Sequence, residues 1–140
     1  MKARIQFDGG CSPNPGNKYG SFNITLDDAF QLQRHRFTLG FGTNNEAEFE
    51  SLIAGIEELR KATTRAQTDP SQIQVHIVTD STIVRNWLQR FEKFKPEKCK
   101  EARRLAMAAL AGKCVALLKD FQSFTVEWNG RENNVAAFGH

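Results

Sequence analysis

Three carboxylates stand where regular elements of the chain are expected to begin or end. Asp8 follows an apolar segment, Asp80 follows another, and Glu48 lies near the start of a helical pattern. Carboxylate oxygens are the ligands that Mg²⁺ prefers, and the ion keeps several waters or substrate phosphates in its octahedral shell. Two such ions about 4 Å apart can activate a water and stabilise the leaving oxygen of a phosphodiester. If the three side chains meet, they predict metal-dependent hydrolysis of a nucleic-acid backbone.

Each of these residues also has an ordinary structural explanation when it is taken alone. Asp8 could start a turn, Glu48 could be a solvated helix residue, and Asp80 could cap a helix beside Ser81. The elements that position the three carboxylates therefore decide between a site and three unrelated surface groups.

The first part of the chain has the pattern of an antiparallel meander. Alternating apolar and polar residues predict three strands, at 3–7, 21–26 and 30–39. A Gly- and Pro-rich run at 9–16 is expected to end the first strand, which leaves Asp8 at its end. A helix capped by Thr43 or Asn44 is expected to run to about Ala62, because its apolar residues recur at helical spacing.

The second part alternates strands with helices. We expect a buried strand at 73–79, helices at 81–91 and 97–118, a last strand at 121–128 and a short helix after Gly130. A strand, a crossover helix and a second strand imply parallel pairing. The order predicts one α/β domain over residues 1–140, with a mixed five-stranded sheet of an antiparallel meander and parallel strands, flanked by helices. In such a sheet, carboxylates at the ends of neighbouring strands face one crevice.

The composition fits one globular domain without a membrane segment. The chain has 140 residues, of which 40% are hydrophobic and 25% charged, and its apolar runs are too short to span a bilayer. The N-terminus lacks a signal-peptide pattern, so we expect a cytoplasmic protein, and a monomer. Cys11, Cys99 and Cys114 lack CxxC spacing and are expected to be reduced thiols. The net charge of +3 is compatible with a polyanionic partner.

Four segments around the carboxylates, taken in order, resemble those of type 1 ribonuclease H. They are FDGGCSPNPG, TNNEAEFESL, VTDST and WNGRENN, and they span nearly the whole chain. The resemblance implies a ribonuclease H-like fold and an endonuclease that hydrolyses the RNA strand of RNA/DNA hybrids. Such an enzyme uses two divalent metal ions and leaves 5′-phosphate and 3′-hydroxyl ends. The resemblance also implies that Asp8, Glu48 and Asp80 hold Mg²⁺, with Mn²⁺ as an alternative.

The last segment departs from the family pattern. The family has a fourth carboxylate there, an Asp within a pattern like Arg-Glu-x-Asn-x-x-Ala-Asp, whereas this chain has no Asp after Asp120. One register puts Asn134 at the metal position, another puts Ala137 there, and Glu132 is a third candidate. We expect Asn134, because an amide oxygen can still bind a hard cation. With one carboxylate fewer, activity is expected to need more metal or to shift towards Mn²⁺.

Small polar side chains near the first two carboxylates are candidates for substrate contacts. By resemblance, Asn14, Asn44 and Asn45 contact the minor groove of the hybrid, and Thr43 helps to bind a phosphate of the DNA strand. Amides suit this work because they both donate and accept hydrogen bonds. A turn role for Asn14 and a capping role for Thr43 or Asn44 could coexist with substrate binding.

Two further features of the family are altered here. Many members carry a His in the loop before the last helix, but this loop has none, and His35, His76 and His140 are expected to have no catalytic role. The run from Arg85 to Lys100 mixes basic and aromatic residues, so it is either a DNA-binding surface or a solvated helix face. Two alternative functions therefore stay open: a hybrid-binding module that has lost catalysis, and another nuclease of the same superfamily.

Overall fold

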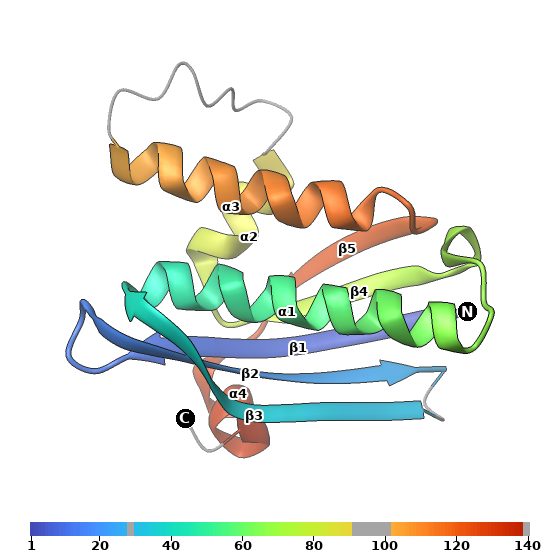
Figure 1. Ribbon diagram of the computed structural model, residues 1–140, viewed down its shortest axis with the longest axis horizontal. Coiled ribbons are helices and arrows are strands. Elements are labelled where there is room, and N and C mark those ends of the chain that lie inside the picture. Colours follow the sequence, from blue (N-terminus) through green and yellow to red (C-terminus); the bar gives the residue numbers. More distant parts are fainter. Residues whose placement is uncertain (28–29, 91–101, 139–140) are drawn as a thin grey trace.

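The computed structural model describes residues 1–27, 30–90 and 102–138, which form a five-stranded sheet with helices on both faces (Figure 1). The elements are β1 (Lys2–Cys11), β2 (Gly16–Leu26), β3 (Phe30–Gly42), α1 (Asn44–Arg65), the 3-10 turn η1 (Pro70–Gln72), β4 (Gln74–Thr79), α2 (Thr82–Arg90), α3 (Ala102–Leu118), β5 (Ser123–Trp128) and α4 (Arg131–Phe138). The predicted start of the third helix at Glu97 lies outside the described residues.

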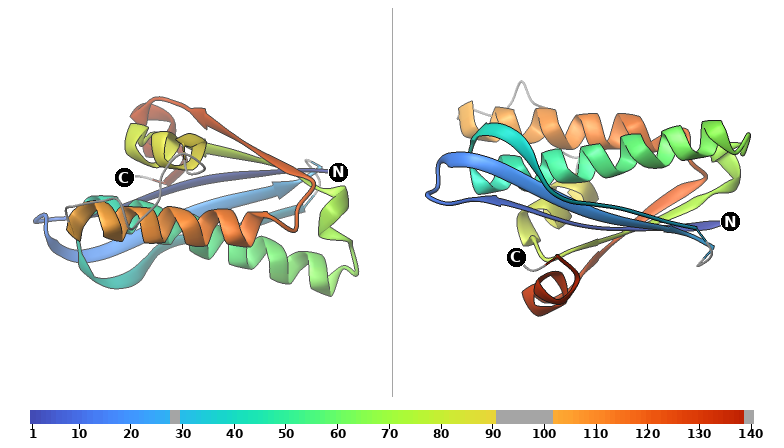
Figure 2. Two further views of the ribbon diagram at one scale, coloured as in Figure 1. Left: turned by 90° about the horizontal axis from the view of Figure 1, so that it is seen from above. Right: turned by 60° about the horizontal axis from the view of Figure 1, so that its bottom comes forward.

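The sheet order is β3-β2-β1-β4-β5. Strands β1, β2 and β3 pair antiparallel, whereas β4 pairs parallel with both β1 and β5. This arrangement confirms the predicted mixed sheet of a meander followed by parallel strands. Helices α1 and α3 cover one face and α4 lies against the other (Figure 2).

Strand β1 extends further than the sequence predicts. Its glycine-rich end does not leave the sheet after Asp8, because Gly9, Gly10 and Cys11 still pair with β2. Pairing of β1 with β4 nevertheless stops at Gln6 and Val78. Asp8 and Asp80 each come two residues after these last partners, so the expected meeting at the carboxyl end of the parallel pair is retained.

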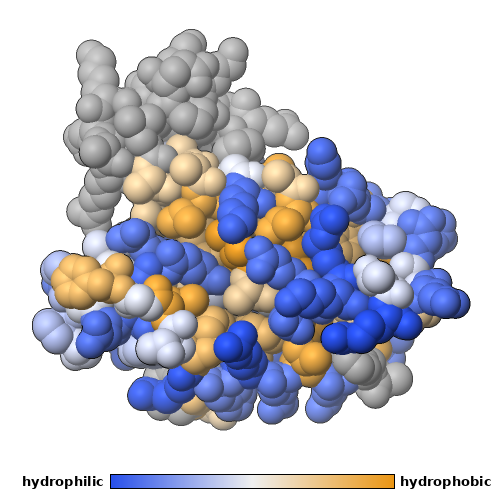
Figure 3. Space-filling view, in the orientation of Figure 1, coloured by the Kyte–Doolittle hydropathy of each residue, from blue (hydrophilic) through white to orange (hydrophobic). Residues whose placement is uncertain are grey.

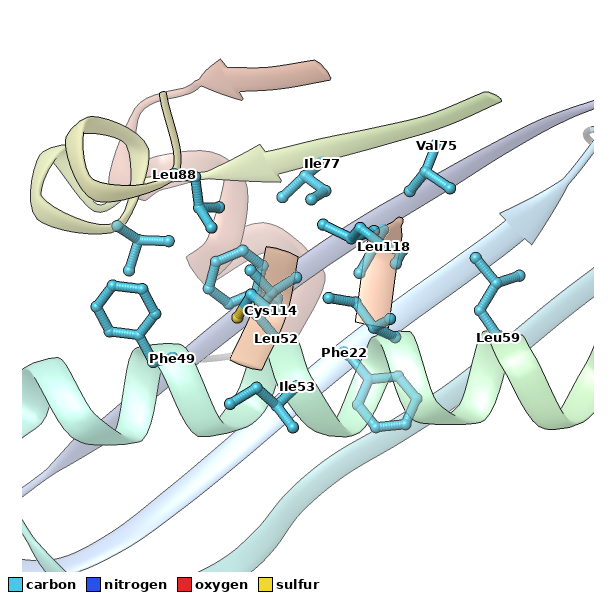
Figure 4. Packing of buried hydrophobic residues seen from close by; sticks show 14 of the residues in the cluster. Phe22, Phe49, Leu52, Ile53, Leu59, Val75, Ile77, Leu88, Cys114 and Leu118 are labelled. Atoms are coloured by element: carbon cyan, nitrogen blue, oxygen red, sulfur yellow. The ribbon is translucent and has the colours of Figure 1, made fainter. Parts of the chain in front are cut away.

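The core lies between the sheet and the α1/α3 layer. Every residue of the apolar stripe predicted for α1 is fully buried: Ala47, Leu52, Ile56 and Leu59. Figure 4 shows Leu52 and Leu59 of α1 facing Val75 and Ile77 of β4 across this layer, with Cys114 and Leu118 of α3 among them. Burial raises the pKa of the Cys114 thiol to about 12, which keeps it protonated. Because α1 is held by this packing, its first turns have a defined place over β1.

The outer face of the helical layer is largely hydrophilic over α1, while apolar side chains gather over α3 (Figure 3). Within the part of the chain that the structure describes, no helix is both long enough and apolar enough to cross a membrane.

Candidate active site

The structure brings the three predicted carboxylates together. Asp8 comes from β1, Glu48 from α1 and Asp80 from the residue after β4. One carboxylate oxygen from each lies within 4.8 Å of the others. They line an open cleft of about 500 Å³ together with residues from the β1–β2 turn, α1, α2 and α4. Residues 72 positions apart in the chain thus face one volume, as expected of strand ends in an α/β sheet.

Glu48 reaches the cleft because α1 begins at a defined residue and packs closely on β1. Thr43 Oγ1 accepts a hydrogen bond from the Glu46 backbone N–H at 3.3 Å, and Glu46 Oε1 accepts one from the Thr43 N–H at 3.1 Å. This reciprocal cap sets the first turn of the helix. A Cβ on Gly9 would lie 2.3 Å from the Ala47 carbonyl oxygen, so only glycine permits this approach of helix to strand.

The electrostatics of the three carboxylates favour a bound cation. Burial, and then the charge of Asp80, raises the pKa of Asp8 to about 7. Burial, and then the charges of Asp8 and Asp80, raises the pKa of Glu48 well above its usual range, and burial raises the pKa of Asp80. One Glu48 oxygen, Oε2, is buried without a hydrogen-bond partner among the described residues. Burial and repulsion between neighbouring carboxylates disfavour their ionised forms, and a divalent cation bound to their oxygens would offset both effects.

The donor set of the cleft fits a hard cation. The three clustered residues offer carboxylate oxygens, which suit Mg²⁺ and Mn²⁺. Cys11 also lines the cleft, but its Sγ donates to the Asn14 amide oxygen at 3.5 Å and to the Gly42 carbonyl at 3.4 Å. The thiol is therefore engaged in local contacts.

The buried side chain of Asn134 reaches Asp80 and the Phe7 carbonyl. The side chain is 2% exposed, its Oδ1 accepts from Gln6 Nε2 at 3.0 Å, and its Nδ2 donates to the Phe7 carbonyl at 3.2 Å. A hydrogen bond from Asn134 lowers the pKa of Asp80, as a donor does. Gln6 Nε2 also donates to the Asn133 carbonyl at 3.4 Å, so backbone carbonyls determine the orientation of both amides.

This orientation bears on the predicted fourth ligand without testing it. The structure brings Asn134 to the carboxylates, but in this arrangement the amide oxygen is directed to Gln6. Ligation by Asn134 stays a prediction, and it would require the amide to turn. Of the other candidates on α4, Glu132 is exposed and Ala137 is half-buried. Like Asn134, neither of them belongs to the residues that line the cleft.

Arg131 belongs to the cleft although the sequence patterns did not indicate it. Its side chain is exposed, lines the cleft with all three carboxylates, and lowers the pKa of Asp8 and of Asp80. Inside WNGRENN an arginine looks like one more matching residue of the family pattern, so only its place in space reveals it.

The predicted substrate-binding residues cluster where the β1–β2 turn meets the start of α1. Asn14 Oδ1 accepts from the Asn44 N–H at 3.1 Å, and Asn44 Oδ1 accepts from the Cys11 N–H at 2.8 Å. Asn44 lines the cleft, while the Thr43 side chain serves in the helix cap. Asn45 lies half-buried in the first turn. Substrate contacts by these four residues stay predictions.

The other sequence predictions lie outside the cleft. His76 contacts Thr125 Oγ1 at 2.7 Å and Glu127 Oε2 at 2.8 Å on the sheet surface, and His35 packs edge-on against Phe138. The basic run from Arg85 to Lys100 belongs to the described residues only as far as Arg90. Cys99 and His140 lie outside the described residues.

Comparison with known proteins gives a consistent set of matches. The family model described as RNase H matches residues 2–129. The bifunctional protein Rv2228c of Mycobacterium tuberculosis is 30% identical over 139 residues, which is 98% of this chain and 34% of that protein. The uncharacterized protein Mb2253c of Mycobacterium bovis matches to the same extent. The chain thus spans about a third of the length of these curated relatives.

Solved structures match over nearly the whole chain. The N-terminal RNase H domain of Rv2228c from Mycobacterium tuberculosis is 27% identical with a TM-score of 0.71, over 96% of this chain and 92% of that one. LC11-RNase H1, isolated from compost, is 25% identical with a TM-score of 0.67, over 97% and 89%. RNase H1 of the archaeon Halobacterium salinarum, at 22% identity and a TM-score of 0.71 over 96% and 89%, shares the fold.

Proposed function

The chain belongs to the RNase H family, type 1, and from that membership we propose that it hydrolyses the RNA strand of RNA/DNA hybrids with two divalent metal ions. The products would carry 5′-phosphate and 3′-hydroxyl ends. The observation that carries the proposal is the meeting of Asp8, Glu48 and Asp80 within 4.8 Å around a buried, unpartnered oxygen of Glu48. A structure of the similar LC11-RNase H1 contains an RNA/DNA hybrid, which supports this choice of substrate.

Asp8, Glu48 and Asp80 would hold the ions, Mg²⁺ or Mn²⁺. When bound, the ions would supply an activated water and stabilise charge on the leaving oxygen. The chain would supply the alignment: β1 and β4 hold two carboxylates just beyond the end of their parallel pairing, and the capped first turns of α1 hold the third. Because the pKa of Asp8 is about 7 without a cation, this carboxyl must release its proton as an ion binds.

Asn14, Asn44 and Asn45 would contact the minor groove of the hybrid, and Thr43 would help to bind a DNA phosphate. The amide oxygens of Asn14 and Asn44 are engaged within the protein. The amide nitrogens of Asn14 and Asn44 make no hydrogen bond within the described residues, so these donors are available to acceptor oxygens of a substrate. We further propose that residues 1–140 act as one catalytic domain; the cytoplasmic location and monomeric state stay predictions.

A hybrid-binding module without catalysis is the second candidate. The observation that favours it is the charge around the site: three carboxylates line the cleft together with the Arg131 guanidinium, and the α4 residue that donates to Asp80 is an amide. Fewer negative charges weaken the hold on two divalent ions, while hybrid binding through the polar cluster would be unaffected.

Cleavage and binding assays separate the two candidates. The chain is incubated with labelled RNA/DNA hybrid, RNA duplex and DNA duplex, in Mg²⁺, in Mn²⁺ and in chelator. The proposed function predicts cleavage of the RNA strand of the hybrid alone, in metal alone. Binding of the hybrid without cleavage in either metal would favour the module.

A matched pair of variants ties any cleavage to the site. Glu48→Gln removes one candidate ligand, and Glu57→Gln makes the same change on the same helix at a partly exposed position outside the cleft, where only a surface ion pair with Lys113 is lost. Glu48→Gln should abolish cleavage and Glu57→Gln should preserve it. Equal loss in both would mean that the activity does not arise from these carboxylates.

A further inference from the structure

Two buried amides, Gln6 of β1 and Asn134 of α4, form a hydrogen-bonded pair beside the carboxylates. Gln6 is 7% exposed and Asn134 is 2% exposed. Gln6 Nε2 donates to Asn134 Oδ1 at 3.0 Å and to the Asn133 carbonyl at 3.4 Å. Gln6 Oε1 accepts from Arg4 Nη1 at 3.5 Å, and Asn134 Nδ2 donates to the Phe7 carbonyl at 3.2 Å. Both ends of each amide therefore have a partner.

Groups of fixed polarity set the direction of both amides. A backbone carbonyl can only accept a hydrogen bond, and a guanidinium can only donate one. The Asn133 carbonyl therefore requires the Gln6 nitrogen, and the Arg4 guanidinium requires the Gln6 oxygen. In the same way the Phe7 carbonyl requires the Asn134 nitrogen, which leaves the Asn134 oxygen to Gln6. Turning the Asn134 amide would place its oxygen against the Phe7 carbonyl and its nitrogen against the Gln6 nitrogen.

The direction of the Asn134 amide matters to the site through Asp80. The Asn134 side chain also donates a hydrogen bond to Asp80. Gln6 pairs across the parallel strands with Val78, two residues before Asp80, so all three side chains belong to the same end of the sheet. A carboxylate that accepts from a fixed donor presents its remaining lone pairs in fixed directions, which is how outer donors orient the ligands of a metal ion.

We propose that Gln6 is a positioning residue of the site: it holds the Asn134 amide with its nitrogen towards Asp80, and the amide in turn orients the Asp80 carboxylate for a divalent cation. This inference rests on the proposed function, in which Asp80 holds an ion. Residue 134 then serves the site as a donor to a ligand. Direct ligation by the Asn134 oxygen is the competing role, and it would require Gln6 to release that oxygen. A role of Gln6 limited to joining α4 to β1 is the structural alternative.

Calorimetric titration with Mn²⁺ tests this role apart from cleavage. The proteins are the wild type, Gln6→Met, Asn134→Ala, the variant that carries both changes, and Gln74→Met. Methionine keeps the length of glutamine without its donor, and Gln74 is the matched control because it lies exposed on β4 outside the cleft. Denaturant unfolding in chelator verifies that each variant is folded.

The expected losses of Mn²⁺ affinity follow from the order of the contacts. Asn134→Ala removes the donor to Asp80 and should weaken binding by about tenfold. Gln6→Met should weaken it by about threefold to fivefold, because the Phe7 carbonyl still holds the Asn134 nitrogen. Gln74→Met should match the wild type. If Gln6 acts through Asn134, Gln6→Met should cause no further loss in the Asn134→Ala background, whereas a structural role would add to it.

NMR of the wild type tests the direction of the amide without any variant. A scalar coupling across the hydrogen bond, from the Asn134 side-chain nitrogen to the Phe7 carbonyl carbon, reports that the nitrogen faces this carbonyl. The proposal predicts the coupling in chelator and its persistence in saturating Mg²⁺. Loss of the coupling when Mg²⁺ is added would mean that the amide turns to bind the ion, and it would overturn the proposal even if Gln6→Met failed to fold.

The combined results decide between the roles of Gln6. Weaker Mn²⁺ binding in Gln6→Met that vanishes in the Asn134→Ala background, together with a persistent coupling, supports the proposal. An Mn²⁺ affinity of Gln6→Met equal to or tighter than that of the wild type, or a loss that adds to that of Asn134→Ala, would overturn it. If the wild type binds no Mn²⁺, or binds it as well after Glu48→Gln, the proposed function fails too. Mn²⁺ that requires Glu48 but is indifferent to Gln6 contradicts this inference alone.

Discussion

Replacing Asn134 by aspartate tests how the amide serves the site. In the wild type the Asn134 nitrogen donates to the Phe7 carbonyl at 3.2 Å and to Asp80. An aspartate at this place has only acceptor oxygens when ionised, so it would face a carbonyl and another carboxylate. Its remaining oxygen could still accept from Gln6, as the amide oxygen does at 3.0 Å.

The size of the effect follows from burial. Asn134 is 2% exposed, so neither the carbonyl nor the new carboxylate can turn to water. An unsatisfied buried carbonyl costs about 1–3 kcal/mol, and a buried charge without a partner costs about 3–5 kcal/mol. Protonation of the new carboxyl limits the sum. We expect Asn134→Asp to unfold about 3 kcal/mol more easily than the wild type in chelator, and Asn134→Ala about 2 kcal/mol more easily.

The assay is denaturant unfolding at neutral pH, first in chelator and then in saturating Mn²⁺. The buried carboxylate of Asn134→Asp destabilises the fold in chelator but can bind an added ion. Mn²⁺ should therefore stabilise Asn134→Asp more than the wild type, by about 1.4 kcal/mol for each tenfold gain in affinity. Hybrid cleavage by Asn134→Asp should accordingly saturate at a lower metal concentration. Asn17→Asp, which makes the same change at an exposed position outside the cleft, is the control.

Two results would refute this reasoning. If Asn134→Asp in chelator is as stable as the wild type, the amide nitrogen is not a donor to Phe7 and Asp80. If its dependence on metal is unchanged, residue 134 does not belong to the metal site at all.

Three further predictions concern the carboxylates and their support. Because the pKa of Asp8 rises from 3.8 to about 7 on folding, the folded chain holds the proton more tightly, so stability in chelator should fall between about pH 4 and pH 7, by about 4 kcal/mol. Denaturant unfolding across that range checks the sign, and stability rising with pH would contradict it. Glu48→Gln should raise stability in chelator at neutral pH by about 1 kcal/mol while it abolishes cleavage, because the raised pKa of Glu48 makes its burial cost either a proton taken up on folding or a charge beside two others. Lower stability than Glu57→Gln would oppose this. Gly9→Ala should destabilise the fold by about 3 kcal/mol, because its Cβ would lie 2.3 Å from the Ala47 carbonyl oxygen. The Cβ of Gly40→Ala would meet open space, so this variant should lose only about 1 kcal/mol, through the positive φ of Gly40. Thermal unfolding of the two variants compares these losses.

The meeting of the three carboxylates could be predicted because it depends on local patterns that the fold preserves. Asp80 ends a continuous apolar strand, and Glu48 follows a recognisable helix cap. Such patterns place residues at the ends of elements, and the parallel pairing of β1 with β4 then brings two ends to one edge. The end of β1 was predicted too early because glycines usually stop a strand, and here close packing against Ala47 keeps Gly9 in the sheet.

The orientation of Asn134 and the place of Arg131 could not be predicted in the same way. Which end of the Asn134 amide faces Asp80 is decided by the Phe7 carbonyl and by Gln6, and these contacts join residues more than 120 positions apart in the chain. Arg131 becomes part of the cleft only through the bonds that attach its loop to Thr79 and Asp80. Sequence spacing carries no information on either set of bonds.

These two residues change the charge balance of the site in the same direction. In the predicted register Asn134 replaces the family's fourth acid, which removes one negative charge, and Arg131 adds one positive charge to the cleft. Three carboxylates and one guanidinium carry a net charge of about −2 when ionised, which one divalent ion neutralises. A second ion would then need the negative charge of a substrate phosphate to bind. Metal occupancy in this chain should therefore depend on the hybrid, with one Mn²⁺ bound in calorimetry of the free protein and a second only when the hybrid is present.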